Sequence, residues 1–172
     1  LFGNQNGLVG YWDFNDGEGS TLTDLSGNGN DGSINGATWS DDVPAPPVPP
    51  TPGGNNSLSF NGSNDYVSIM DDESLTSTSA MTVSAWFKKV SDTGWMSLVG
   101  KGTSDVNEEY VLMLKDDQVY FDVGQGGGPY LQQSTAIAPE TWHHIAAVHT
   151  RSGNTSTLKV YLNGEDVGGT TV

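Results

Sequence analysis

One short loop of the sequence combines oxygen-bearing side chains with glycines in a pattern suited to metal binding. Segment 24–31 reads DLSGNGND, and its carboxylate and amide oxygens belong to Asp24, Asn28, Asn30 and Asp31. Calcium binds about six to eight such oxygens, and glycines allow a loop to fold them inward. The same residue types also form Asx turns, in which Asn and Asp side chains bond to their own backbone. Calcium binding and turn formation are therefore both open here.

Two aromatic residues beside turns are candidates for binding a sugar. Trp95 follows the turn-forming segment 91–94, and Tyr130 follows the glycine-rich segment 126–129, with Gln132 close behind it. The flat face of an aromatic ring matches the C–H face of a pyranose, and amides bind its hydroxyls. We therefore expect a ligand site that includes Trp95, Tyr130 and Gln132. The alternative is that both aromatics are ordinary half-buried residues at strand ends.

The remaining reactive side chains give little support for catalysis. Glycoside hydrolysis requires two closely spaced carboxylates, and the nearest approach to such a pair is Asp105 with Glu109. The three histidines all lie within 142–149. On a strand, His143 and His149 would share a face about 20 Å apart, too far for one metal ion. Without a nucleophile elbow or a phosphate-binding loop, the chain is predicted not to be an enzyme.

Charge and composition exclude several classes of partner. The chain of 172 residues has 6 Lys and Arg against 21 Asp and Glu, a formal net charge of −15. Such a field repels nucleic acid and anionic membranes, and it disfavours acidic polysaccharides unless a cation bridges them to the protein. The absence of cysteine excludes disulfides, thiol catalysis and cysteine-based zinc sites. No apolar run is long enough to predict a membrane span.

Short alternating runs predict strands along most of the sequence. In segment 80–88, Met81, Val83, Ala85 and Phe87 fall on one face, which is the period of a strand. Two pairs of runs flank short turns and predict hairpins: 109–114 with 118–123, and 142–149 with 157–162. Three Asn-Gly pairs, at 35–36, 61–62 and 163–164, indicate tight turns. Because no window shows helical periodicity, the prediction is an all-β, two-sheet antiparallel β-sandwich.

One segment interrupts this pattern. Residues 41–54 hold six of the eight prolines, and prolines at that density favour an extended chain that cannot join a central strand. The forty residues that precede it are too few to fold alone without disulfides or metal. We therefore expect segment 41–54 to be a surface loop within a single domain, 1–172.

Six segments in a fixed order carry a resemblance to a known family. They are GLVGYWDFNDGEG (7–19), DLSGNGNDG (24–32), SLSFNGSNDYV (57–67), MTVSAWF (81–87), WHHIA (142–146) and LKVYLNG (158–164). Together they resemble the concanavalin A-like lectin/glucanase superfamily, in its laminin G or pentraxin-like jelly-roll form. The resemblance implies a concanavalin A-like jelly roll, with a further strand beyond Thr170–Val172. It also implies calcium near the 24–31 loop and the acidic turn before it, at Asp16 and Glu18.

The function that the resemblance implies is non-catalytic carbohydrate binding. We expect a calcium-stabilised module of a larger secreted or cell-surface protein, with further domains on the same chain. Its partner would be a polysaccharide or another glycan, neutral or reached through calcium. A structural or adhesion module that binds protein or acts as a spacer is the first alternative. A polysaccharide hydrolase or lyase is the second.

Overall fold

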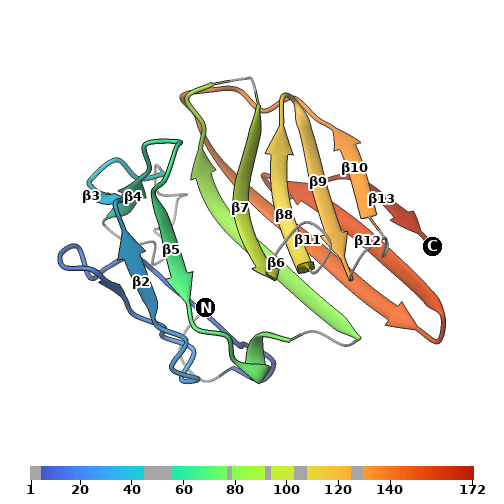
Figure 1. Ribbon diagram of the computed structural model, residues 1–172. Coiled ribbons are helices and arrows are strands. Elements are labelled where there is room, and N and C mark those ends of the chain that lie inside the picture. The colour runs from blue at the N-terminus through green and yellow to red at the C-terminus, as the bar shows by residue number, and fades with distance from the viewer. Residues whose placement is uncertain (1–4, 45–55, 77–78, 92–93, 103–107, 125–129) are drawn as a thin grey trace. The chain divides into compact units, whose positions relative to one another are not determined.

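The computed structural model of the chain describes residues 5–44, 56–76, 79–91, 94–102, 108–124 and 130–172. The chain forms two compact units, Leu1–Thr76 and Ser77–Val172, coloured blue to green and green to red in Figure 1. The single domain expected from the sequence stays a prediction. Most of the predicted proline-rich loop, residues 45–54, lies outside the described residues. No helix in the described ranges is long and apolar enough to cross a membrane.

The first unit contains short strands and a single 3-10 turn in its described part. A three-stranded antiparallel sheet has the order β1 (Thr21–Leu22), β2 (Gly32–Asn35), β5 (Tyr66–Ile69), and a separate ribbon pairs β3 (Thr38–Ser40) with β4 (Ser57–Ser59). The 3-10 turn, η1 (Glu73–Leu75), begins after Asp72, whose carboxylate accepts a hydrogen bond from the Ser74 N–H. Gly36 and Gly62 of the predicted Asn-Gly turns both have positive φ, the conformation for which glycine suits such turns.

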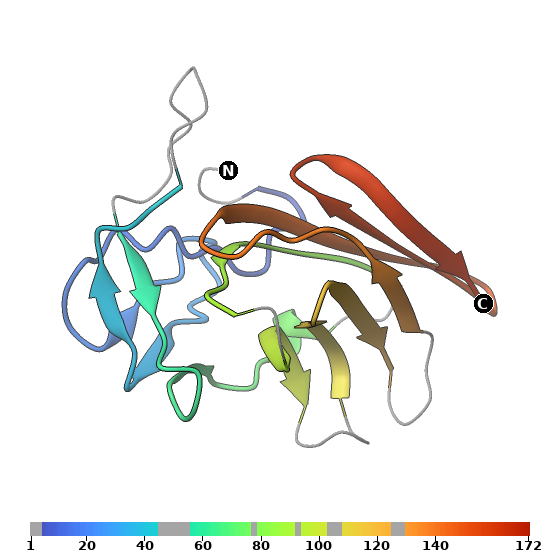
Figure 2. The ribbon, with the colours of Figure 1, turned by 90° about the horizontal axis from the view of Figure 1, so that it is seen from above.

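The second unit is a sandwich of two four-stranded antiparallel sheets. The first sheet has the order β10 (Tyr130–Ser134), β9 (Gln118–Val123), β8 (Glu108–Lys115), β7 (Trp95–Gly102). The second has the order β13 (Glu165–Thr171), β12 (Thr155–Leu162), β11 (Trp142–Ser152), β6 (Ala80–Lys88). Figure 2 shows these two sheets as separate layers. The all-β jelly-roll sandwich predicted from the sequence is confirmed.

Both predicted hairpins of this unit are confirmed by the strand register. Lys115 pairs with Gln118 across the turn between β8 and β9, and Ser152 pairs with Thr155 between β11 and β12. A further hairpin joins β12 to β13 through Asn163 and Gly164, which both have positive φ. Two consecutive residues of this kind match the twist of a tight antiparallel hairpin, which is why Asn-Gly is favoured there.

The core lies between the two sheets of the second unit. Leu112, Leu114 and Phe121 of one sheet are fully buried with Ile145 and Leu158 of the other. The predicted alternation in β6 is confirmed, since Phe87 is buried while Trp86 is exposed. Inward and outward residues alternate along β6 and β9, and the exposed outward residues are the ones available for a ligand.

Candidate functional site

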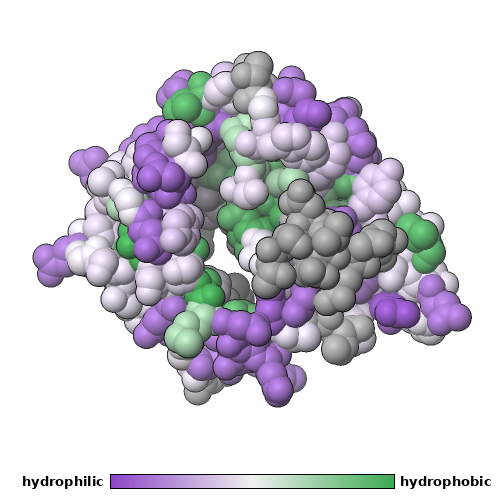
Figure 3. Space-filling view, viewed as in Figure 1, coloured by the Kyte–Doolittle hydropathy of each residue, from purple (hydrophilic) through white to green (hydrophobic). Residues whose placement is uncertain are grey.

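The outer face of the β7–β10 sheet, the side turned away from the core, gathers aromatic and polar side chains. Along β9, Val119, Phe121 and Val123 are buried, so the residues between them point outward. The register aligns three outward rows across the sheet: Trp95, Lys115 and Gln118; Ser97, Met113, Tyr120 and Gln132; and Gly100, Val111, Asp122 and Tyr130. The three residues predicted to bind a ligand, Trp95, Tyr130 and Gln132, therefore share one face. In Figure 3, the part of this side that grey atoms leave visible is white to purple along its upper edge, with a green area near its middle.

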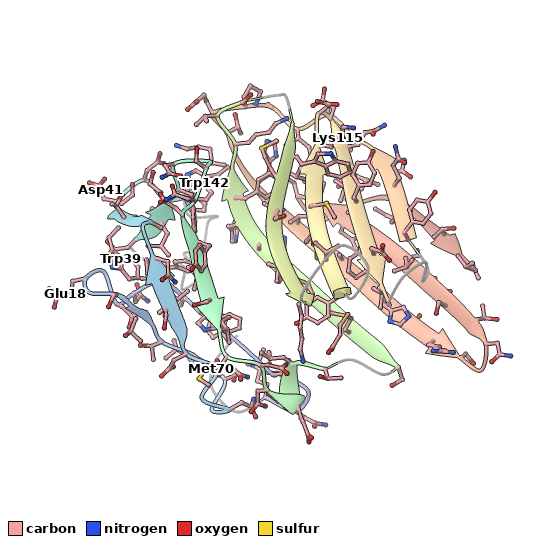
Figure 4. The ribbon with its side chains drawn as sticks, in the orientation of Figure 1. Glu18, Trp39, Asp41, Met70, Lys115 and Trp142 are labelled. Carbon is pink, nitrogen blue, oxygen red and sulfur yellow. The ribbon has the colours of Figure 1, made fainter. Side chains whose placement is uncertain are left out.

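Direct contacts connect the side chains of this face. The Trp95 and Tyr120 rings lie with their centroids 4.8 Å apart at 56°, and the Lys115 Nζ is 4.9 Å from the Trp95 ring centroid. Lys115 lies at the end of β8 (Figure 4). The Tyr120 hydroxyl donates to Gln118 Oε1 at 2.7 Å, and Gln132 Nε2 donates to the same oxygen at 2.9 Å. Hydrogen bonds and ring contacts thus hold these side chains in place before any ligand arrives.

A groove of about 470 Å³ lies beside Tyr130, where the edge strands β10 and β13 approach each other. Most of its lining is polar and comes from strands β9, β10 and β13: Gln118, Gln132, Gln133 and Thr170, with Tyr130 and Gly169. The Gln133 amide lies against Gly168, where an added Cβ would clash with it. Amides and a hydroxyl around an open groove, beside a ring that is 61% exposed, are groups that can bind sugar hydroxyls and stack on a pyranose.

Asp122 is an acidic residue of this face that sequence reasoning missed. It lies directly opposite Tyr130 in the register, and its Oδ1 is buried without a hydrogen-bond partner among the described residues. Burial raises the pKa of this carboxyl, although a hydrogen bond from the Val123 N–H acts in the opposite direction. A perturbed carboxyl of this kind is more frequent at functional sites than elsewhere.

Gln118, Tyr120 and Thr170 were also missed as candidates. The alternation of 118–123 alone would have placed Gln118, Tyr120 and Asp122 on one face of a strand. Thr170 could not have been found in this way, because its position in the groove depends on two edge strands that are far apart in the sequence.

The predicted calcium loop is organised around one carboxylate. Asp24 is 8% exposed; its Oδ1 accepts from the Tyr11 and Ser26 N–H groups, and its Oδ2 accepts from the Asn30 N–H and the Ser26 hydroxyl. Burial alone would raise the pKa of Asp24, but these hydrogen bonds together hold it below the ordinary value. The bonds to Ser26 are those of an Asx turn.

The other predicted metal ligands do not converge on Asp24. Asp31 accepts from the Asp24 N–H, and Asp16 accepts from the Thr23 N–H and hydroxyl, which lower the pKa of Asp16. Asn28 and Asn30 donate through their side-chain nitrogens to carbonyls of the segment Leu8–Val9. Glu18 is exposed on the loop before β1 (Figure 4).

This donor set does not fit a calcium ion at Asp24, because N–H and O–H groups already occupy both carboxylate oxygens. No group of three or more acidic or histidine side chains in the described part of the chain could hold a metal ion. Calcium binding stays a prediction, without a coordinating geometry to describe.

The histidines have structural partners, as their positions on a strand suggest. His143 is buried, donates through Nε2 to the Ala138 carbonyl at 3.0 Å and accepts through Nδ1 from Asn163 Nδ2 at 3.1 Å. Asn163 Oδ1 also accepts from the His144 N–H at 2.9 Å. His149 is buried with its Nε2 3.2 Å from the Ser156 hydroxyl, and burial lowers its pKa.

Of the carboxylates weighed for catalysis, Asp105 lies outside the described residues. Glu109 forms an ion pair with Lys101, with 3.4 Å between Oε2 and Nζ. The described residues therefore do not show the two together.

The chain belongs to the concanavalin A-like lectin/glucanases superfamily, whose family model matches residues 61–172. A search of curated proteins finds no match. Two solved structures share the fold. The binding domain of Paraclostridial Mosquitocidal Protein 1 has a TM-score of 0.63 and 17% identity over 90% of this chain. A structure of botulinum neurotoxin type C, whose cell entry depends upon interaction with two ganglioside molecules, has a TM-score of 0.53 and 15% identity over 92%.

The match takes in only part of each toxin structure. The chain spans 38% of the mosquitocidal protein structure and 40% of the neurotoxin structure. At these identities the likeness establishes the fold, and a shared fold can serve many functions.

Proposed function

We propose that the chain is a non-catalytic carbohydrate-binding module that holds its glycan in the groove between β10 and β13. The observation that carries the proposal is the exposed Tyr130 ring beside a groove lined by glutamine amides and Thr170. A pyranose can stack on the ring while its hydroxyls exchange hydrogen bonds with the amides.

The charge of the protein favours a neutral glycan. The described residues that line the groove include no lysine or arginine, and the formal net charge is −15. An anionic sugar would approach against this field without a cation in the groove to compensate. The alternative to a neutral glycan is an anionic glycan that a calcium ion bridges to the protein.

The kind of parent protein to which the module belongs is proposed from its structural neighbours. Both structural neighbours come from toxins, one described as a binding domain and the other from a toxin whose cell entry depends on gangliosides. These neighbours support a role in binding rather than catalysis, in a secreted or cell-surface protein with further domains.

Affinity electrophoresis in gels that contain a soluble polysaccharide tests this function. The panel consists of laminarin, xyloglucan, galactomannan, hydroxyethyl cellulose and starch, with heparin as the anionic member. We expect at least one neutral polymer to retard the protein and Tyr130→Ala to abolish most of the retardation. Tyr66→Ala is the matched control, because Tyr66 is 56% exposed against 61% for Tyr130 and lies in the other unit. Equal retardation of Tyr130→Ala and the wild type would contradict the proposal.

A second observation favours a protein-binding role and keeps the adhesion alternative open. On the outward side of the other sheet, Trp86 is 50% exposed and its ring centroid lies 5.2 Å from that of His144, while Lys88 Nζ is 5.7 Å from the Trp142 ring centroid. Exposed aromatic side chains such as Trp86 are enriched in protein interfaces. Loss of partner binding in Trp86→Ala, with none in Tyr130→Ala, would support this alternative.

A further inference from the structure

Trp95 lies outside the groove that the proposed function uses. It is on β7, the edge strand opposite β10, and none of the groove lining comes from β7. Yet its ring is 57% exposed on the same outer face as Tyr130 and Gln132. Two exposed aromatic rings therefore stand at opposite edges of one sheet face.

The side chains between the two edges form a continuous chain of contacts. The Trp95 ring touches the Tyr120 ring, Tyr120 bonds to Gln118, and Gln118 bonds to Gln132 on β10. These bonds fix the orientation of the Gln132 amide, whose nitrogen is engaged by Gln118, so that its oxygen is the atom left to accept from a ligand hydroxyl. A face ordered in advance loses little side-chain entropy when a ligand binds.

The width of this face exceeds that of a single sugar ring. From β7 to β10 there are three strand spacings of about 4.8 Å each, or about 14 Å across the strands. Trp95 also lies two register rows away from Tyr130 along the strands, which adds a displacement of about 13 Å in that direction. A monosaccharide stacked on Tyr130 cannot reach Trp95, whereas a chain of several linked sugars laid diagonally across the sheet face can contact both rings.

From this arrangement we infer that the outer face of the β7–β10 sheet binds an extended glycan chain that runs diagonally across the strands, with Trp95 as a second sugar-binding position. The inference rests on the proposed function and adds to it the class of ligand, an internal stretch of a linear polysaccharide rather than a single terminal sugar. Tyr120, in the row between those of the two rings, and its hydrogen-bond partner Gln118 lie along the path of such a chain.

Isothermal titration with oligosaccharides of defined length tests this inference. The probes are the disaccharide and hexasaccharide of the cello-, laminari-, xylo-, manno- and malto-series. For the series that binds, we expect the wild type to bind the hexasaccharide about tenfold more tightly than the disaccharide. Trp95→Ala should remove most of this difference while leaving the disaccharide affinity within about twofold. Trp95→Phe, which keeps an aromatic face, should retain most of it.

Trp86→Ala serves as the matched control, because Trp86 is similarly exposed on the other sheet, and it should bind both lengths as the wild type does. Equal affinity of the wild type for the two lengths, or an undiminished difference in Trp95→Ala, would overturn the inference and leave the proposed function standing. Failure of the wild type to bind any series would instead overturn the proposed function, and the inference with it.

Discussion

Asp24 illustrates how a single buried carboxylate can organise a loop. Its two oxygens accept four hydrogen bonds from Tyr11, Ser26 and Asn30, and backbone N–H groups that lose a buried acceptor are costly to leave unpaired. We expect Asp24→Ala to destabilise the first unit by about 2–4 kcal/mol. Amide exchange of Ser26 and Asn30 measures this loss, and unchanged protection of both amides would contradict it.

The same carboxylate makes the stability of this loop depend on pH. Because the pKa of Asp24 is lowered in the folded protein, the unfolded chain takes up its proton first as the pH falls. The stabilisation is complete above the ordinary aspartate value of about 3.9 and is lost as the pH falls through the folded value. We expect the protection of the Ser26 amide to fall below about pH 4 in the wild type, and to show a smaller fall in Asp24→Asn.

Asp122 presents the opposite case. Burial raises its pKa, and no group in the described part of the chain donates to its Oδ1, so the charged form costs stability at neutral pH. Asp122→Asn keeps the shape and removes the charge, and we expect it to stabilise the protein by up to about 1 kcal/mol at pH 7. The gain should shrink as the pH falls, since both forms are then neutral. Urea unfolding at several pH values measures it, and a destabilised Asp122→Asn at pH 7 would argue against an uncompensated charge.

At the scale of elements, the hairpin between β12 and β13 depends on Asn163. Its positive φ fits the turn, and its amide bonds to His143 and to the His144 backbone on the neighbouring strand β11. Asn163→Ala loses both features and should destabilise the protein by about 1–3 kcal/mol. Asn163→Gly, which tolerates positive φ but has no amide, should lose less. Equal losses in denaturant melts of the two variants would show that the backbone conformation contributes little.

The elements were predictable from the sequence to the extent that their patterns are local. The alternation of 80–88 and the Asn163-Gly164 pair both depend on neighbouring residues, and both predictions are confirmed. The site depends on cross-strand register, which brings Tyr120 beside Trp95 and Gln132 beside Gln118. No pattern along one strand specifies that register. The groove depends further on two edge strands, and only Tyr130 and Gln132 of its lining were predicted as ligand-binding residues from the sequence.

At the scale of the whole molecule, the excess of acidic residues predicts a response to ions. With a formal net charge of −15, self-repulsion opposes the compact state, and salt screens it. We expect the melting temperature to rise by a few degrees between about 0.02 and 0.5 M NaCl.

Calcium can be separated from this general screening by a matched melt. Because the Asp24 oxygens are already engaged, we expect calcium and magnesium at equal concentration to raise the melting temperature equally. EDTA should leave it unchanged. An additional rise with calcium alone, growing with concentration, would support the calcium site predicted at loop 24–31.

Backbone amide shifts in an NMR titration test the central claim most directly. The labelled protein would be titrated with the neutral oligosaccharide that binds in the length series. Glycan binding at the groove predicts that the shifted amides gather on β9, β10 and β13, around Gln118, Gln132 and Thr170, and that Tyr130→Ala suppresses them. Shifts that gather instead around Trp86 and His144, or along loop 24–31, would contradict the assignment of the site.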